Sequence, residues 1–240
     1  MTQAAPKEYE QLRVSGLHAF YGESHILHGI DLVVNRGELV TLLGRNGAGR
    51  STTLKAIMNM VGRRTGSIMI NGEETMACAP HHIARLGVGY CPEHRGIFSE
   101  LNVQENLTLP PVVRSGGMGL EEIYSMFPNL YERRFSQGTK LSGGEQQMLA
   151  MARILRTGAN MLLLDEITEG LAPVIVEKLG EVLLKLKEKG LTIVLVEQNF
   201  HFAAPLADRH YVMEHGQIAE EISADELEAK QSLLNDYLGV

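Results

Sequence analysis

A glycine-rich segment that joins an apolar run to a helix-like run constrains the fold of this chain more than any other feature. Residues 44–52 read G-R-N-G-A-G-R-S-T, after the apolar run Leu39–Leu43 and at the start of the helical pattern Ser51–Met60. Glycines at this spacing let backbone N–H groups converge on phosphate oxygens at a helix N-terminus. The alternative is a glycine-rich strand–helix turn without a ligand. The pattern favours an α/β fold with a phosphate-binding loop, in which Arg50 replaces the usual Lys.

A second motif, L-S-G-G-E-Q-Q-M-L, occupies residues 141–149. Ser142 and Glu145 are three residues apart and fit a capping box at the start of a helix. Capping does not explain Gly143 and Gly144, because consecutive glycines cost stability in a first turn unless something approaches the backbone closely. An anion held by Ser142 and the two glycine N–H groups is one such partner.

A pair of acidic residues, Asp165 and Glu166, follows the apolar run Met161–Leu164. One interpretation of two acids at the end of a buried strand is an ordinary polar turn. After a phosphate-binding loop, the same pair is typical of an Asp that binds Mg²⁺ and a Glu that activates water.

The three motifs, in this order and spacing, resemble those of the ATP-binding-cassette (ABC) transporter ATPases, and the resemblance covers about residues 11–240. A narrower resemblance rests on M-F-P-N-L-Y-E-R-R, E-G-L-A-P and L-V-E-Q-N. These segments are similar to the smaller ATPase subunit of branched-chain amino-acid importers. Importers of short amides and urea share much of the same pattern, so the transported substrate stays open.

The resemblance implies a nucleotide site. Tyr21 matches the aromatic residue that stacks on adenine, with an exposed tyrosine at a strand end as the alternative. Glu93 stands where most cassettes carry Gln, and is expected to sense Mg²⁺ and the γ-phosphate; the alternative is an ordinary loop carboxylate. The full set expected to bind nucleotide is Tyr21, Gly44, Arg45, Asn46, Gly47, Ala48, Gly49, Arg50, Ser51, Thr52 and Glu93.

The same resemblance implies the chemistry of ATP hydrolysis. Ser51 and Asp165 are expected to hold Mg²⁺, and Glu166 to polarise the attacking water. Gln198 occupies the position of the family's switch histidine. Gln can bond a phosphate oxygen or water but cannot carry a proton or a charge. We therefore expect Glu166 and Gln198 to be the catalytic pair, with hydrolysis slowed by Arg50 and Gln198.

The resemblance also implies partners. The signature loop Ser142, Gly143, Gly144 and Glu145 is expected to complete the site of a second ATPase subunit, so that ATP is held within a homo- or heterodimer. Closure of that dimer would move two membrane permease subunits, which a periplasmic or lipid-anchored substrate-binding protein serves indirectly. The alternative is a regulatory partner subunit that binds ATP and hydrolyses it weakly.

The remaining patterns predict a P-loop NTPase core with a mainly parallel sheet, an N-terminal antiparallel β subdomain and an inserted helical lobe at about residues 92–160. Alternation of apolar and polar residues indicates the antiparallel strands, and strand–helix alternation indicates the parallel sheet. A flexible tail is expected at residues 1–10, before the ATPase domain of residues 11–240. The expected elements include strands Leu12–Phe20, Ile26–Val34, Ile68–Ile70 and Leu191–Val196, the helix Val174–Lys189, and a hairpin around His215 and Gly216.

Composition limits the class of protein further. A net charge of −7 argues against broad nucleic-acid binding. No apolar run reaches the length of a membrane-spanning helix, and M-T-Q-A-A-P-K-E-Y-E at the start lacks the apolar core of an export signal. We expect a cytoplasmic protein, peripheral on the inner face of the cell membrane. Cys78 and Cys91 lack the spacing of metal ligands and are expected to be free thiols.

Overall fold

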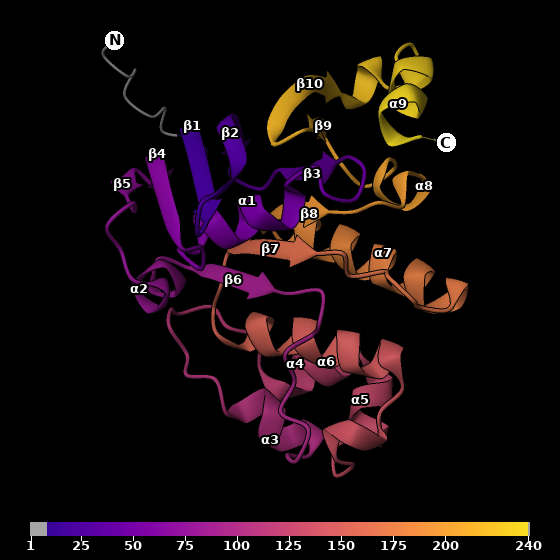
Figure 1. Cartoon of the computed structure of the whole chain (residues 1–240). Helices are drawn as coiled ribbons and strands as arrows, with labels where there is room; N and C mark the ends of the chain where they lie inside the picture. The colour runs from indigo at the N-terminus through magenta and orange to yellow at the C-terminus, as the bar shows by residue number, and fades with distance from the viewer. Residues whose placement is uncertain (1–8, 240) are drawn as a thin grey trace.

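The computed structural model describes residues 9–239, coloured along the chain in Figure 1. The expected tail at residues 1–10 falls mostly outside the described residues, but its last position does not. The first strand, β1, already begins at Glu10, whose side chain is only 4% exposed and pairs with Arg13. The folded domain therefore begins before residue 11.

An antiparallel sheet forms the N-terminal part of the fold, as the alternating pattern predicts. Its strand order is β2-β1-β4-β5, with β1 at Glu10–Tyr21, β2 at Ser24–Asn35, β4 at Arg63–Ile70 and β5 at Glu73–Glu74. The predicted strands Leu12–Phe20 and Ile26–Val34 lie inside β1 and β2. One face of the sheet packs apolar side chains such as Leu17 and Ile30 into a buried core.

A six-stranded sheet carries the candidate site. Its order is β10-β9-β3-β8-β7-β6, and every neighbouring pair is parallel except β10 with β9. Parallel strands of one sheet end at the same edge, so the loops that follow β3, β7 and β8 meet there (Figure 1). The strands are β3 at Leu39–Leu43, β6 at Val88–Cys91, β7 at Met161–Asp165, β8 at Thr192–Val196, β9 at Arg209–Glu214 and β10 at Gln217–Ser223.

The central strands are buried on both faces, because each contributes to two hydrophobic cores. Leu162 and Leu164 of β7 belong to the core that also contains the helical lobe. The alternate residues Met161 and Leu163 belong to the core under the antiparallel sheet. This explains why β7 appears in the sequence as an unbroken apolar run rather than as an alternating one.

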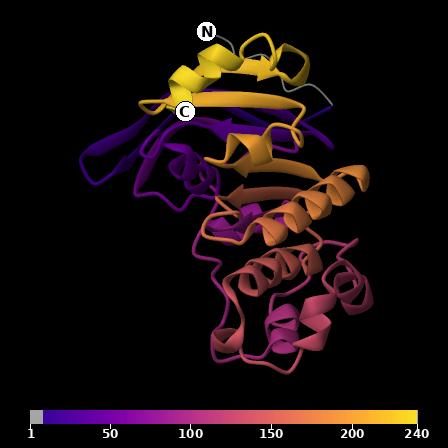
Figure 2. The same ribbon diagram turned by 90° about the vertical axis from the view of Figure 1, so that its right-hand side faces the viewer.

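A helical lobe follows β6 and hangs below the six-stranded sheet in Figures 1 and 2. Its longest helix, α6, spans Gly143–Arg156 and packs against the other helices of the lobe and against β6. The α6 helix therefore joins the lobe to the sheet. The other helices of the lobe are α3 at Val103–Thr108, α4 at Leu120–Met126 and α5 at Pro128–Glu132.

The remaining helices lie around the sheets: α1 at Arg50–Ile57, α2 at Pro80–Arg85, α7 at Pro173–Glu188, α8 at Phe200–Ala203 and α9 at Gln231–Leu238. The expected helix Ser51–Met60 ends earlier than predicted, because the chain turns through a left-handed backbone at Asn59 (φ 55°). The expected helix Val174–Lys189 is shifted by one residue at each end. Both cysteines are free, as expected. Within residues 9–239, no helix combines the length and the apolar character that crossing a membrane requires.

Candidate nucleotide site

The phosphate-binding loop connects β3 to α1 in a conformation that needs glycine. A Cβ added at Gly44 would lie 2.4 Å from the carbonyl oxygen of Met213, and one at Gly49 would lie 2.8 Å from Leu27. Both glycines, and Gly47 between them, have positive φ. No atom lies within 4 Å of the Cβ position at Gly47, so this part of the loop faces open space.

A cavity of about 420 Å³ lies over this loop. Its walls are Ile26, the loop and helix residues Asn46, Gly47, Ala48, Gly49, Arg50, Ser51 and Thr52, and the three acids Glu93, Glu166 and Glu169. Backbone N–H groups at a helix start and a wall of hydroxyl and carboxylate oxygens are suited to a phosphate group with its cation. The loop residues and two of the three expected acids, Glu93 and Glu166, thus line one cavity.

Ser51 and Asp165 lie together although they are far apart in the sequence. The Ser51 hydroxyl donates a 2.7 Å hydrogen bond to Asp165 Oδ1, and the Tyr90 hydroxyl donates one of 3.0 Å to Asp165 Oδ2. Burial, with Asp165 adding to it, raises the pKa of Tyr90 above its usual range, so this hydroxyl stays a donor. Tyr90 was not among the expected site residues, because only tertiary contact brings β6 beside β7.

Arg50 does not extend freely into the cavity. Its side chain is 4% exposed, and its Nη1 donates a 2.9 Å hydrogen bond to the carbonyl oxygen of Glu197. Its Nη2 forms a 2.6 Å ion pair with Glu166 Oε1. The two nitrogens of the guanidinium fork therefore bridge two segments, whereas a Lys would have to reach both acceptors from one nitrogen.

Glu166 sits on a left-handed backbone (φ 48°), and its N–H donates to the carbonyl oxygen of Val196 at 2.9 Å. Burial raises the pKa of this carboxyl, and the guanidinium of Arg50 opposes the rise. A hydrogen bond with Glu169 also raises the pKa. Carboxylate oxygens of Glu93, Glu166 and Glu169 all lie within 4.8 Å of one another.

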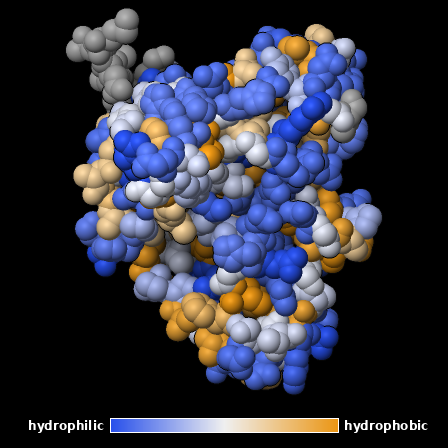
Figure 3. Space-filling model, in the orientation of Figure 1, coloured by the Kyte–Doolittle hydropathy of each residue, from blue (hydrophilic) through white to orange (hydrophobic). Residues whose placement is uncertain are grey.

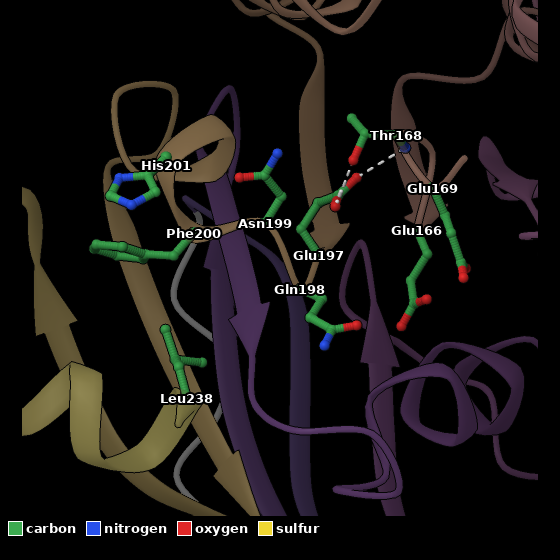
Figure 4. Close-up of a pocket in the computed structure, with 9 residues that line it drawn as sticks. All are labelled: Glu166, Thr168, Glu169, Glu197, Gln198, Asn199, Phe200, His201 and Leu238. Carbon is green, nitrogen blue, oxygen red and sulfur yellow. Dashed lines mark hydrogen bonds between the residues drawn. The ribbon is translucent and has the colours of Figure 1, made fainter. Parts of the chain in front are cut away.

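The side chain of Glu197, just after β8, is a buried carboxylate that the expected site residues did not include. It accepts hydrogen bonds from the backbone N–H (3.1 Å) and hydroxyl (2.9 Å) of Thr168, drawn as dashes in Figure 4. Burial raises the pKa of Glu197 to about 7. The only sequence signal was its place in L-V-E-Q-N, which carries no burial information.

The raised pKa of Glu197 predicts that the free energy of unfolding depends on pH. Its folded pKa of about 7 lies above its ordinary value of 4.5, so the folded protein binds the extra proton between these pH values. The stabilisation is complete below pH 4.5 and is lost as pH rises through 7. Relative to Glu197→Gln, the parent should lose about 3 kcal/mol of unfolding free energy between pH 4.5 and 8.

Urea unfolding of both proteins across this pH range measures the difference. Glu188→Gln, which changes an exposed carboxyl of α7, is the matched control and should keep the slope of the parent. Parallel curves for the parent and Glu197→Gln would contradict the prediction.

Gln198 is exposed and lines a second cavity of about 400 Å³ beside the first. Figure 4 shows its amide and the Glu166 carboxylate in this cavity, with Leu238 of α9 on another wall. Arg45 points away from the phosphate loop toward the same helix, where its Nη2 donates to the carbonyl oxygen of Asp236 at 3.3 Å. Tyr21 is 42% exposed at the end of β1.

The signature loop lies at the start of α6 and contributes nothing to the walls of the phosphate-loop cavity among the described residues. Ser142 and Glu145 form the capping box that the sequence allowed: the Ser142 hydroxyl accepts from the Glu145 N–H, and the Glu145 carboxylate accepts from the Ser142 N–H. A Cβ at Gly144 would lie 2.9 Å from Ile175, and one at Gly143 would lie 3.3 Å from the guanidinium of Arg95.

Packing alone therefore accounts for Gly144, where the sequence argument invoked an anion. The sequence argument required a close approach to the backbone, and Ile175 makes that approach at Gly144. The predicted role of this loop in a second subunit's site stays a prediction.

A phosphate loop, an acidic pair after β7 and a helical lobe on a parallel sheet define the class of P-loop nucleotide-binding proteins. The family model for the ABC transporter matches residues 27–169. The chain belongs to the ABC transporter family and is one of its ATPases. The expected fold class and family are confirmed.

Individual relatives support membership of the same family. The high-affinity branched-chain amino acid transport ATP-binding protein BraG of Pseudomonas aeruginosa is 38% identical, over 92% of this chain and 96% of its own length. The lipopolysaccharide export system ATP-binding protein LptB of Escherichia coli K12 is 30% identical, over 95% and 97%. A dimeric ATP-binding cassette in a post-hydrolysis state, bound to ADP and Pi, superimposes with a TM-score of 0.79 at 25% identity, over 89% of this chain and 98% of that one.

Proposed function

We propose that this chain is the ATP-hydrolysing subunit of an importer for branched-chain amino acids, in which two such subunits close on ATP. The observation that carries the hydrolytic part is the convergence of Glu166, Arg50 and Ser51 on the cavity over the phosphate loop. The substrate part is supported by the 38% identity to BraG, against 30% to a lipopolysaccharide export ATPase. Importers of short amides or urea are the second candidate.

The chemistry proposed for the site is phosphoryl transfer to water, which depends on position and charge more than on covalent steps. Glu166 would accept a proton from the attacking water, and the amide of Gln198 would bond a phosphate oxygen or that water. The N–H groups of Gly47 and Gly49 would hold phosphate oxygens, with Arg50 as their counter-charge. Tyr21 would stack on adenine, and Glu93 would report the state of the γ-phosphate to the lobe.

Magnesium fits the oxygens that Ser51 and Asp165 present. A hydroxyl and a carboxylate only 2.7 Å apart are hard donors of the kind Mg²⁺ takes when it keeps several water ligands. The ion would supply charge neutralisation for the phosphates. The Tyr90 hydroxyl orients the Asp165 carboxylate, which lies behind Ser51, and Ser51 lines the cavity.

The partners follow from the proposed assembly. The signature loop Ser142–Glu145 would meet the phosphates bound by a second ATPase subunit, and two membrane permease subunits would dock on the helical lobe. The lobe exposes large apolar side chains, including Phe98, Tyr131 and Phe135, and Figure 3 shows apolar surface over the lower part of the molecule. The protein would then be cytoplasmic and peripheral on the inner face of the membrane.

A regulatory subunit with weak hydrolysis is the other class of function, favoured by the ion pair that Arg50 makes with Glu166. Phosphate release by the purified chain with ATP and Mg²⁺, alone and with a partner ATPase subunit, separates the two. We expect turnover by the chain alone of about 0.1–10 s⁻¹, below the ordinary range of enzymes or at its lower end. Turnover found only in the partner would support the regulatory role.

The substrate is tested in the assembled transporter with its binding protein. Leucine, isoleucine or valine should stimulate ATP hydrolysis, whereas urea and acetamide should not. Stimulation by the amides alone would replace the proposed substrate and leave the hydrolytic assignment intact.

A further inference from the structure

Both the side chain and the backbone carbonyl of Glu197 accept hydrogen bonds. Its side chain is 2% exposed, and its carboxylate accepts the N–H and the hydroxyl of Thr168. Its carbonyl oxygen accepts Nη1 of Arg50. Hydrogen bonds satisfy this carboxylate, yet a well-packed apolar side chain at a buried position is often at least as stabilising as an ionisable one. The contacts therefore point to a role outside stability.

The segment that Glu197 holds is the one that carries Glu166. Thr168 lies two residues after Glu166, in the loop between β7 and α7. The Glu166 N–H is fixed to Val196, the residue before Glu197, so Val196–Glu197 contacts this loop at two points. Between these points the backbone of Glu166 adopts its left-handed conformation. A strained residue persists where the surrounding structure determines it, and the Thr168 anchor is part of that structure.

Gln198 follows Glu197 directly and reaches the same cavity as Glu166 (Figure 4). In that view the bonded pair Glu197–Thr168 lies above the Gln198 amide and the Glu166 carboxylate, which point toward the same space. The Glu197 carboxylate thus sets the separation between Glu166 and Gln198, the two side chains proposed to act on the same water and phosphate.

We infer that Glu197 is a positioning residue for ATP hydrolysis: through Thr168 it holds Glu166 at the distance from Gln198 that the reaction needs. Its carboxylate is bonded to Thr168, and it acts through that residue. The inference rests on the proposed role of Glu166 as the group that activates water. Glu197 lies outside the walls of the phosphate-loop cavity, although it lines the adjoining cavity with Gln198, so its loss should lower the rate constant and leave ATP affinity nearly unchanged.

The test compares steady-state kcat and KM for ATP in Glu197→Ala, Thr168→Val and the double variant. Glu197→Ala should lower kcat by about a hundredfold, the effect of misplacing a reacting group by about 1 Å, with KM changed less than about threefold. Thr168→Val keeps the backbone N–H bond, so a loss of roughly tenfold is expected. The double variant should be no slower than Glu197→Ala, because both changes remove the same contact.

Two further variants separate positioning from folding. Glu197→Gln can still accept from the Thr168 N–H and should retain kcat within about fivefold. Thr75→Val removes a hydroxyl that is equally buried but lies beside the other sheet, bonded to the carbonyl of Ile68; it should leave kcat unchanged. If Glu197→Ala does not fold, Thr168→Val against Thr75→Val decides, and equal kcat for those two overturns the inference.

The inference is also overturned if the kcat losses of the two single variants multiply in the double variant. A Glu197→Ala enzyme with the parental kcat overturns it as well. Failure of the proposed function has a different signature. If Glu166→Gln keeps its kcat, the catalytic assignment itself is wrong, whatever the Glu197 variants show.

Discussion

Glu166→Gln is expected to lower ATP hydrolysis by about 10²–10⁴-fold, because the amide keeps the size of the side chain but cannot accept the proton of the attacking water. ATP affinity should change little, since the phosphate loop and the Ser51–Asp165 pair remain intact. A nucleotide that is bound and not cleaved should hold the proposed dimer closed.

Phosphate release and molecular mass measure the two effects in the same sample. With ATP and Mg²⁺ the variant should elute as a dimer at micromolar concentration, and with ADP as a monomer. Glu188→Gln, on an exposed position of α7, should behave as the parent. A monomeric Glu166→Gln protein with bound ATP would rule out the closed dimer for the isolated chain, and undiminished hydrolysis would rule out Glu166 as the base.

Arg50→Lys is expected to raise turnover by about tenfold at similar ATP affinity. In the parent, one nitrogen of Arg50 binds the Glu197 carbonyl at 2.9 Å and another pairs with Glu166 at 2.6 Å. The negative charge of Glu166 is then balanced by a guanidinium that always remains protonated. Glu166 is therefore a weaker acceptor for a proton from water. Lys has one nitrogen on a shorter side chain and lacks the fork that holds both partners at separate atoms, so we expect Glu166 to be freed while the phosphates keep a counter-charge.

The comparison needs kcat, KM and ATP affinity for both proteins. Arg45→Lys is the matched control, because Arg45 lies in the same loop but contacts Asp236 instead of the acids of the cavity. Unchanged or lower turnover in Arg50→Lys would mean that the site has adapted to Arg and that the ion pair does not slow the reaction.

Most of the fold was accessible from the sequence, because local pattern and global structure agree in the central elements. The continuous apolar residues of β7 and β8 indicated strands buried on both faces, and the glycine-rich loop fixed the strand–helix connection. Elements without a strong local pattern were missed. The strand β6 has only four residues, one of them Gly89, and α9 has only eight residues, so each is too short to be recognised from periodicity alone.

The site was accessible where a motif names consecutive residues, and inaccessible where it depends on tertiary contact. The phosphate loop and Asp165–Glu166 could be found from spacing. Tyr90 and Glu197 could not, because a hydrogen bond between side chains on neighbouring elements leaves no mark at a fixed sequence distance. Gly144 is a related case: the sequence indicated that something approaches its backbone closely, but not that Ile175 does so.

The left-handed backbone at Glu166 has an evolutionary consequence. A side chain other than Gly or Asn costs about 1–3 kcal/mol in this conformation, and the cost is the same whether or not the protein turns over ATP. A lineage that kept the subunit only as a scaffold would gain thermal tolerance by exchanging this one residue for Asn or Gly. A carboxylate at this position therefore lowers stability permanently, and the proposed role of Glu166 in hydrolysis would give a reason to keep it.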